Sequence, residues 1–184
     1  DLVISAQIAN YTKSTVFCPY YSLAPENPFP AALDDIFKVA KQLWSTSDNP
    51  PLLMGESAGA TLAISLTHLL KKHGLVMPAR MGLLSPASDL YNQGDSFSFN
   101  QNRDPILTLE NVTAVSSIYA GNAKLDDPLL SPIYGSFDKT YPKTLITSGT
   151  QDLLLSSCIR LAKIMREAEV DVELRVWEGM WHVF

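Results

Sequence analysis

A serine flanked by two glycines stands at the point where an apolar run changes into a helical pattern. The run is Leu52–Met54, and Ser57 follows it within a Gly-x-Ser-x-Gly motif made by Gly55 and Gly59. This context is typical of a nucleophile elbow, a strand-to-helix turn that exposes a serine oxygen at the edge of a sheet. We expect glycine at both flanks because it removes Cβ atoms that would clash in such a turn. The alternative is an ordinary turn flanked by glycines.

An acid and a histidine each follow a later strand-like run. Asp152 comes after Thr144–Thr147, and His182 comes after the alternating run Val172–Trp177. Parallel strands gather functional groups at their carboxyl ends, so we expect Ser57, Asp152 and His182 to converge there. A serine hydroxyl is a weak nucleophile until a neighbouring base takes its proton. We therefore predict that the serine is the nucleophile, the histidine is the base and then the acid, and the aspartate orients the imidazole.

The other histidines and acids are weaker candidates for this chemistry. His68 and His73 fall in the helix predicted after the serine, where a structural role is expected. Asp171 precedes its strand and would lie at the opposite edge of the sheet. Glu178 is so near the histidine in sequence that it competes with Asp152 only through a short local loop.

Two neighbours of the serine receive supporting roles. The backbone N–H of Ala58 is expected to donate one hydrogen bond to the oxyanion that forms during acyl transfer. Glu56 is expected to help hold the turn by hydrogen bonds rather than to take part in the chemistry.

The composition describes one ordinary globular domain. The chain has 184 residues, of which 46% are hydrophobic and 18% charged, and its formal net charge is -5. This charge and the lack of a Lys/Arg cluster argue against nucleic acid and anionic membrane surfaces as partners. No apolar run reaches membrane-spanning length, so stable membrane insertion is not expected. A small uncharged substrate fits better, and the composition leaves the oligomeric state open.

Strand-like and helix-like segments alternate along the chain, which predicts an α/β fold. The predicted strands cover residues 15–18, 52–54, 81–84, 144–147 and 172–177, and the predicted helices lie within 2–10, 32–43, 62–70, 109–119 and 154–165. Residues 20–30 form a proline-rich loop, and residues 48–51 break the helical pattern before the strand that precedes the serine. Cys18, in a predicted strand, and Cys158, in a predicted helix, are expected to be buried free thiols.

Residues 89–128 are the least regular part of the sequence. Asn, Gln, Asp and Ser surround Phe97 and Phe99 before the predicted helix at 109–119. Long irregular connections inside a compact domain are commonly functional. We therefore predict a single catalytic domain over residues 1–184, with residues 89–128 inserted as a lid or pocket wall. The alternative is a surface excursion without a function.

Four stretches together resemble the hormone-sensitive lipase family of α/β-hydrolases. They are Leu23–Ala32, which reads LAPENPFPAA, then Gly55–Gly59, Gly149–Asp152 and Trp181–Phe184. The order serine, acid, histidine is also the α/β-hydrolase order. The resemblance implies an α/β-hydrolase fold, a mostly parallel sheet with helices on both faces. It also implies hydrolysis of small or medium acyl esters through a Ser-Asp-His triad, without a cofactor or metal.

Two alternatives to ester hydrolysis stay open, because one fold hosts many functions. One is a relative that binds a ligand and has lost its chemistry, although all three triad residue types are retained. The other is a hydrolase of the same fold that cleaves an amide or another bond. An aspartate nucleophile would indicate dehalogenase or epoxide chemistry, and Ser57 occupies that place instead.

The chain also departs from the family pattern. The family commonly has Asp where Glu56 stands, Arg where Ser22 stands and His where Asn27 stands. The family's His-Gly-Gly motif, whose amides complete the oxyanion hole, has no counterpart in these 184 residues. We therefore expect that these 184 residues are a piece of a longer protein. The piece would lack the first strands of the sheet, the His-Gly-Gly motif and a last helix. The sheet would then be interrupted between the strands at 15–18 and 52–54, and hydrolysis would depend on the upstream segment.

Overall fold

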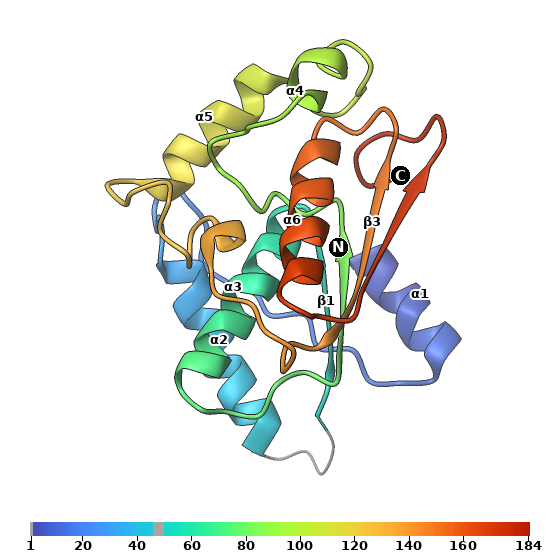
Figure 1. Cartoon of the computed structure of the whole chain (residues 1–184). Helices are drawn as coiled ribbons and strands as arrows, with labels where there is room; N and C mark the ends of the chain where they lie inside the picture. The colour runs from blue at the N-terminus through green and yellow to red at the C-terminus, as the bar shows by residue number, and fades with distance from the viewer. Residues whose placement is uncertain (1, 46–49) are drawn as a thin grey trace.

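A parallel four-stranded sheet forms the centre of the chain (Figure 1). The computed structural model describes residues 2–45 and 50–184. The strands are β1 (Leu52–Glu56), β2 (Arg80–Leu84), β3 (Lys143–Gly149) and β4 (Val172–Trp177). They lie side by side in chain order, and each pairs in parallel with the next. All four carboxyl ends therefore lie at one edge of the sheet, where the candidate residues are expected.

The connections between the strands carry most of the helices. The helices are α1 (Leu2–Thr12), α2 (Ala31–Ser45), α3 (Ala58–Lys72), α4 (Ser96–Phe99), α5 (Leu109–Ala120) and α6 (Leu155–Glu167), with a 3₁₀ turn η1 at Pro132–Tyr134. Crossovers between parallel strands are right-handed, so strands added in one direction receive their helices on one side. Figure 1 shows α2, α3 and α6 on one side of the strands and α1 on the other. The predicted α/β arrangement is confirmed.

One predicted strand is wrong. Residues 15–18 are irregular and largely exposed, and no described strand pairs with them. Valine and phenylalanine favour a strand only where a neighbouring strand and a core receive them. Phe17 is 62% exposed, and Cys18 is exposed rather than buried. The described sheet is continuous from β1 to β4, so the interruption expected after residues 15–18 is not found.

The predictions for the end of α3 and for Cys158 are confirmed. The helix that follows Ser57 ends at Lys72, and Gly74 behind it adopts a φ of +62°, a conformation that glycine takes at little cost. Cys158 is buried in α6 as expected. The predicted break over residues 48–51 lies partly outside the described residues. Residues 89–128 contain α4 and the predicted helix α5, and their role as a lid or pocket wall stays a prediction.

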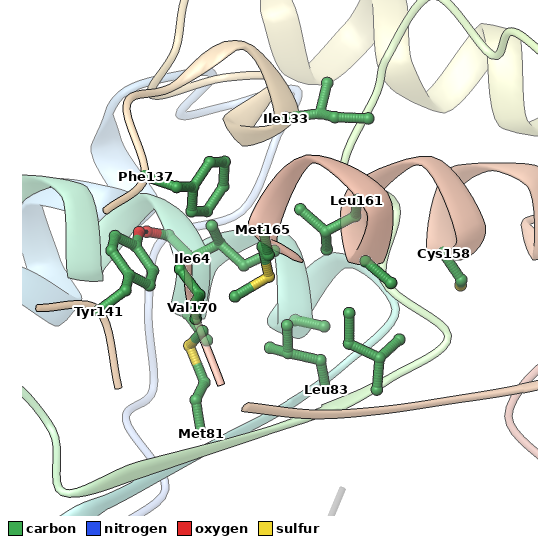
Figure 2. Close-up of a cluster of buried hydrophobic side chains, with 14 residues drawn as sticks. Ile64, Met81, Leu83, Ile133, Phe137, Tyr141, Cys158, Leu161, Met165 and Val170 are labelled. Carbon is green, nitrogen blue, oxygen red and sulfur yellow. Dashed lines mark hydrogen bonds between the residues drawn. The ribbon is translucent and has the colours of Figure 1, made fainter. Parts of the chain in front are cut away.

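The core that holds the strand ends lies between the sheet and the helices α3 and α6. Figure 2 shows Ile64 from α3, Leu83 from β2 and Leu161 and Met165 from α6 among the side chains that meet there. All four side chains are fully buried. Burying one such side chain stabilises the fold by about 1.5 to 3 kcal/mol. This packing holds both helices rigidly against the strands whose ends carry the candidate residues.

A buried histidine lies on the same helix α3. His68 Nε2 is 3.1 Å from the carbonyl oxygen of Pro132, and Nδ1 is 3.0 Å from the hydroxyl of Tyr141. A carbonyl oxygen only accepts, so Nε2 carries the proton and Nδ1 accepts from the tyrosine. Burial lowers the pKa of His68 to about 4, with a smaller effect from the nearby charge of Lys71.

We expect the stability of the protein to fall as the pH falls from about 6.5 to about 4 because His68 is neutral when folded. Below its ordinary pKa the unfolded chain binds a proton that the folded chain does not bind. Above about pH 6.5 the neutral His68 makes its full contribution to the free energy of unfolding. Lowering the pH to about 4 removes roughly 3 kcal/mol of that free energy. Urea unfolding across the interval measures it. His68→Gln should flatten the curve, whereas His73→Gln, an exposed change directly after the same helix, should not. Parallel curves for the protein and His68→Gln would exclude His68 as the cause.

Candidate active site

Ser57 lies between β1 and α3 in a turn that few side chains tolerate. Its φ is 51° and its ψ is -117°. Holding a residue other than glycine in such a conformation costs about 1 to 3 kcal/mol, and the surrounding structure must enforce it. Here the N–H of Ser57 donates to the carbonyl oxygen of Leu84 at 2.8 Å, which extends the hydrogen bonding between β1 and β2 past the end of β1. The turn predicted from the Gly-x-Ser-x-Gly motif is present.

The two glycines of the motif differ in their steric roles. A Cβ atom on Gly55 would lie 2.3 Å from the carbonyl oxygen of Gly59, so the backbone would have to move. A Cβ atom on Gly59 would meet no described atom within 4 Å outside its own turn of α3. The predicted clash therefore exists at Gly55, but the prediction is wrong for Gly59. The reason is that the first turn of α3 approaches β1 from one side only.

The neighbours of the serine are placed differently from one another. Ala58 is the first residue of α3 and is exposed. The first four N–H groups of a helix have no acceptor within it, so the Ala58 amide is free of intrahelical bonding. Glu56 is half-buried, and no hydrogen bond from its side chain to another described residue is seen. Its expected part in holding the turn is therefore not seen.

Asp152 lies in the turn after β3 and is completely buried. Its Oδ2 accepts a hydrogen bond from Ser148 Oγ at 2.7 Å, and its Oδ1 accepts one from the N–H of Leu154 at 2.9 Å. Burial raises the pKa of Asp152, but the hydrogen bond and charge of His182 act against it. Further hydrogen bonds from Ser85 and Leu154 add to this effect, so that the pKa lies below its ordinary value. The carboxylate is therefore charged at neutral pH.

His182 connects the acid to the serine. It follows β4, is 4% exposed, and has Nδ1 3.1 Å from Asp152 Oδ1 and Nε2 2.9 Å from Ser57 Oγ. Because an ionised carboxylate only accepts, Nδ1 carries the proton and Nε2 accepts from the serine hydroxyl. The structure thus brings together the three residues that the sequence singled out. In this arrangement a proton can pass from the serine oxygen to the imidazole.

The loop that carries the histidine packs closely on the turn that carries the acid. The N–H of Gln151 donates to the carbonyl oxygen of Met180 at 2.8 Å, and the N–H of Gly179 donates to Thr150 Oγ1 at 2.8 Å. A Cβ atom on Gly149 would lie 2.0 Å from the carbonyl oxygen of Met180. A glycine at the end of β3 is therefore needed for the loop to approach this closely.

The competing residues lie elsewhere. His68 is bonded within the core, and His73 lies at the end of α3. Asp171 directly precedes β4 and pairs with Lys143 Nζ at 2.8 Å, at the amino end of the strands. Glu178 is exposed. The sequence argument for Asp152 over the other acids agrees with this placement.

Three polar residues around the acid were not predicted from the sequence. Ser148, inside β3, donates a hydrogen bond to Asp152 Oδ2, and Ser85, directly after β2, helps to lower the pKa of Asp152. Ser85 has a φ of 47°, and its Oγ also accepts the N–H of Val183 at 3.2 Å. Asn100 bonds to the backbone of the acid turn. The two serines could have been found in the sequence, because each is a small polar residue at or directly after the end of a strand.

Ser22 stands where the hormone-sensitive lipase family commonly has arginine. Its Oγ donates to Asp35 Oδ2 at 2.6 Å, and its N–H donates to the same oxygen at 3.1 Å. These bonds from Ser22 lower the pKa of Asp35. A pair of hydrogen bonds from Ser22 therefore connects this loop to α2.

No group of three or more His, Cys, Asp or Glu side chains in residues 2–45 and 50–184 is arranged to hold a metal ion. Among the helices of these same residues, none combines the length and the apolar character needed to cross a bilayer.

Comparison with known proteins identifies relatives over nearly the whole chain. The model of the alpha/beta hydrolase fold family matches residues 3–184. An esterase of Acinetobacter venetianus is 33% identical, over 98% of this chain and 60% of its own length. An acetyl-hydrolase of Streptomyces hygroscopicus is 28% identical, over 98% of this chain and 61% of its own length. The chain thus spans about three fifths of the length of these relatives.

Solved structures agree with these relatives. A hormone-sensitive lipase from a metagenome library superposes with a TM-score of 0.95 at 36% identity, covering 100% of this chain and 63% of that one. The hormone-sensitive lipase homologue EstE7, also from a metagenome library, superposes with a TM-score of 0.92 at 35% identity, with the same coverage. The chain therefore belongs to the α/β-hydrolase fold family, among the members related to hormone-sensitive lipase.

Proposed function

We propose that the protein hydrolyses carboxylic esters, with Ser57 as nucleophile, His182 as base and then acid, and Asp152 as the residue that orients the imidazole. The pair of contacts made by His182 carries this proposal, because one ring nitrogen reaches Ser57 Oγ at 2.9 Å and the other reaches Asp152 Oδ1 at 3.1 Å. The esterase and acetyl-hydrolase relatives support the choice of bond.

The contacts of His182 support the following sequence of proton transfers. Ser57 Oγ attacks the carbonyl carbon of the ester while His182 Nε2 takes the hydroxyl proton. The ionised Asp152 stabilises the imidazolium that forms, without taking its proton. The imidazolium then protonates the departing alcohol oxygen and leaves an acyl group on the serine. Water attacks this acyl-enzyme as His182 takes the water's proton, and Ser57 regains its proton when the carboxylic acid departs.

The Ala58 amide is proposed as one donor to the oxyanion. Its place beside Ser57 at the start of α3, without an intrahelical acceptor, supports this role. The partial positive charge at a helix N-terminus acts in the same direction. One such donor is commonly worth about a hundred- to a thousandfold in rate.

We expect the purified full-length protein to hydrolyse nitrophenyl acetate and butyrate with a higher kcat/KM than nitrophenyl palmitate. The acetyl-hydrolase relatives support the preference for a short acyl group. The nitroanilide of the same acid should react far more slowly, because an amine leaves less readily than a phenolate. Saturable binding of these esters without turnover would instead favour the ligand-binding relative. Faster cleavage of the anilide would favour an amide hydrolase.

A further inference from the structure

Three buried polar side chains from α4 and the turn behind it face the backbone of the acid turn. Ser96, Asn100 and Asp104 are spaced four residues apart and are 5%, 3% and 7% exposed. The N–H of Asn100 donates to the carbonyl oxygen of Ser96 at 2.8 Å, and that of Asp104 donates to the carbonyl oxygen of Asn100 at 2.9 Å. Helical bonding therefore places the three side chains on one face. In Figure 1, α4 lies above the ends of β3 and β4.

Asn100 uses its side-chain amide on the two carbonyl groups that flank the acid turn. Its Nδ2 donates to the carbonyl oxygen of Thr150 at 3.1 Å and to that of Asp152 at 2.9 Å. Both hydrogens of the amide are thus used on backbone atoms within three residues of each other. The two acceptors of Asn100 belong to Thr150 and Asp152, not to Ser57 or His182. Any effect of Asn100 on Ser57 and His182 therefore passes through the acid turn.

The two neighbours of Asn100 on this face hold the next residue of the turn. Ser96 Oγ donates to the carbonyl oxygen of Leu153 at 2.7 Å, and Asp104 Oδ2 accepts the N–H of Leu153 at 2.8 Å. Ser96 also exchanges hydrogen bonds with Ser156 at the start of α6, each N–H donating to the other hydroxyl at 3.0 Å. The backbone on both sides of the acid is therefore fixed from one short segment.

We propose that Asn100 is a positioning residue for the acid of the proposed triad, supported by Ser96 and Asp104, and this inference rests on the proposed function. By holding the carbonyl groups of Thr150 and Asp152, it fixes the direction from which the carboxylate accepts the Nδ1–H of the histidine. The segment 96–104 then holds the backbone of the turn that carries Asp152. It does so although it lies within the stretch predicted as a lid or pocket wall.

The test replaces Asn100 by aspartate and uses Asn102→Asp as the matched control. A carboxylate cannot donate to the two carbonyl oxygens and repels them, whereas Asn102 is exposed and receives the same change of charge. Because a displacement of about 1 Å in a catalytic group commonly costs about a hundredfold in rate, we expect kcat for nitrophenyl acetate to fall by about 10- to 100-fold in Asn100→Asp. KM should stay nearly unchanged. The control should keep both constants.

A spectroscopic readout separates positioning from general loss of stability. The proton between His182 Nδ1 and Asp152 gives a far-downfield signal in proton NMR when the hydrogen bond is intact. This signal should shift or broaden in Asn100→Asp and stay in place in Asn102→Asp, while both variants remain folded by circular dichroism. If Asn100→Asp does not fold, Asn100→Ser, which keeps one donor and adds no charge, should show a smaller loss of kcat and a smaller shift.

The outcomes distinguish the inference from the function on which it rests. An Asn100 variant that keeps the kcat and the downfield signal of the unchanged protein would overturn the positioning role, even if it unfolded at a lower temperature. Failure of the proposed function would show in the unchanged protein itself, as an absence of ester turnover. It would also show as full turnover in Ser57→Ala.

Discussion

The protein with Ser57→Ala is expected to lose ester hydrolysis almost completely and to keep its fold. Removing Oγ takes away both the atom that attacks the ester and the proton that His182 Nε2 accepts at 2.9 Å. Loss of the serine from such a triad lowers kcat by about 10⁶-fold, and the residual rate comes from substrate binding and oxyanion stabilisation. The fold should survive because the substitution removes one oxygen from a half-buried side chain.

Steady-state hydrolysis of nitrophenyl acetate measures this loss, and circular dichroism checks the fold. Ser98→Ala is the matched control, because Ser98 is an exposed serine in α4. It should keep the full rate. Substantial turnover in Ser57→Ala would show that another residue is the nucleophile, and the contacts of His182 would then have a structural meaning only.

Replacing Asp152 by asparagine is expected to lower kcat by about 10⁴-fold. The carboxylate of Asp152 accepts the Nδ1–H of the histidine at 3.1 Å and so keeps Nε2 free to accept from the serine. An amide in that place can donate to Nδ1, which favours the other tautomer and puts the ring proton on Nε2. The imidazolium also loses the buried negative charge beside it.

Two other acids provide the controls for this change. Asp171→Asn and Glu178→Gln remove the carboxylates that competed in the sequence, and neither should change kcat by more than a small factor. Asp171 lies at the amino end of β4, and Glu178 is exposed. If Glu178→Gln reduced kcat as strongly as expected for Asp152→Asn, and Asp152→Asn did not, the acid would have been assigned wrongly.

The sequence predicted most of the fold because the hydrophobic spacing of most elements agrees with their burial. The stripe through Cys158, Leu161 and Met165 forms the buried face of α6. The alternating run Val172–Trp177 forms β4 with the predicted bounds. The segment at 15–18 has strand-forming residues and yet no strand, because pairing and burial depend on neighbours that local sequence does not reveal.

The three candidate residues were predictable because each follows a strand, and parallel strands end at the same edge. The residues that position the acid were not predictable in this way. Asn100 lies 52 positions before Asp152, and only the fold brings its amide to that turn. The difference between Gly55 and Gly59 also depends on the side from which α3 approaches β1, which the motif does not contain.

Covalent labelling of the active protein tests the central claim most directly. The protein is inactivated with an organophosphonate that carries a nitrophenyl leaving group, and the modified residue is located by peptide mass spectrometry. We predict one phosphonyl group per inactivated molecule, attached to Ser57, and no label in Ser57→Ala under the same conditions. Complete inactivation with the Ser57 peptide unmodified would contradict the account.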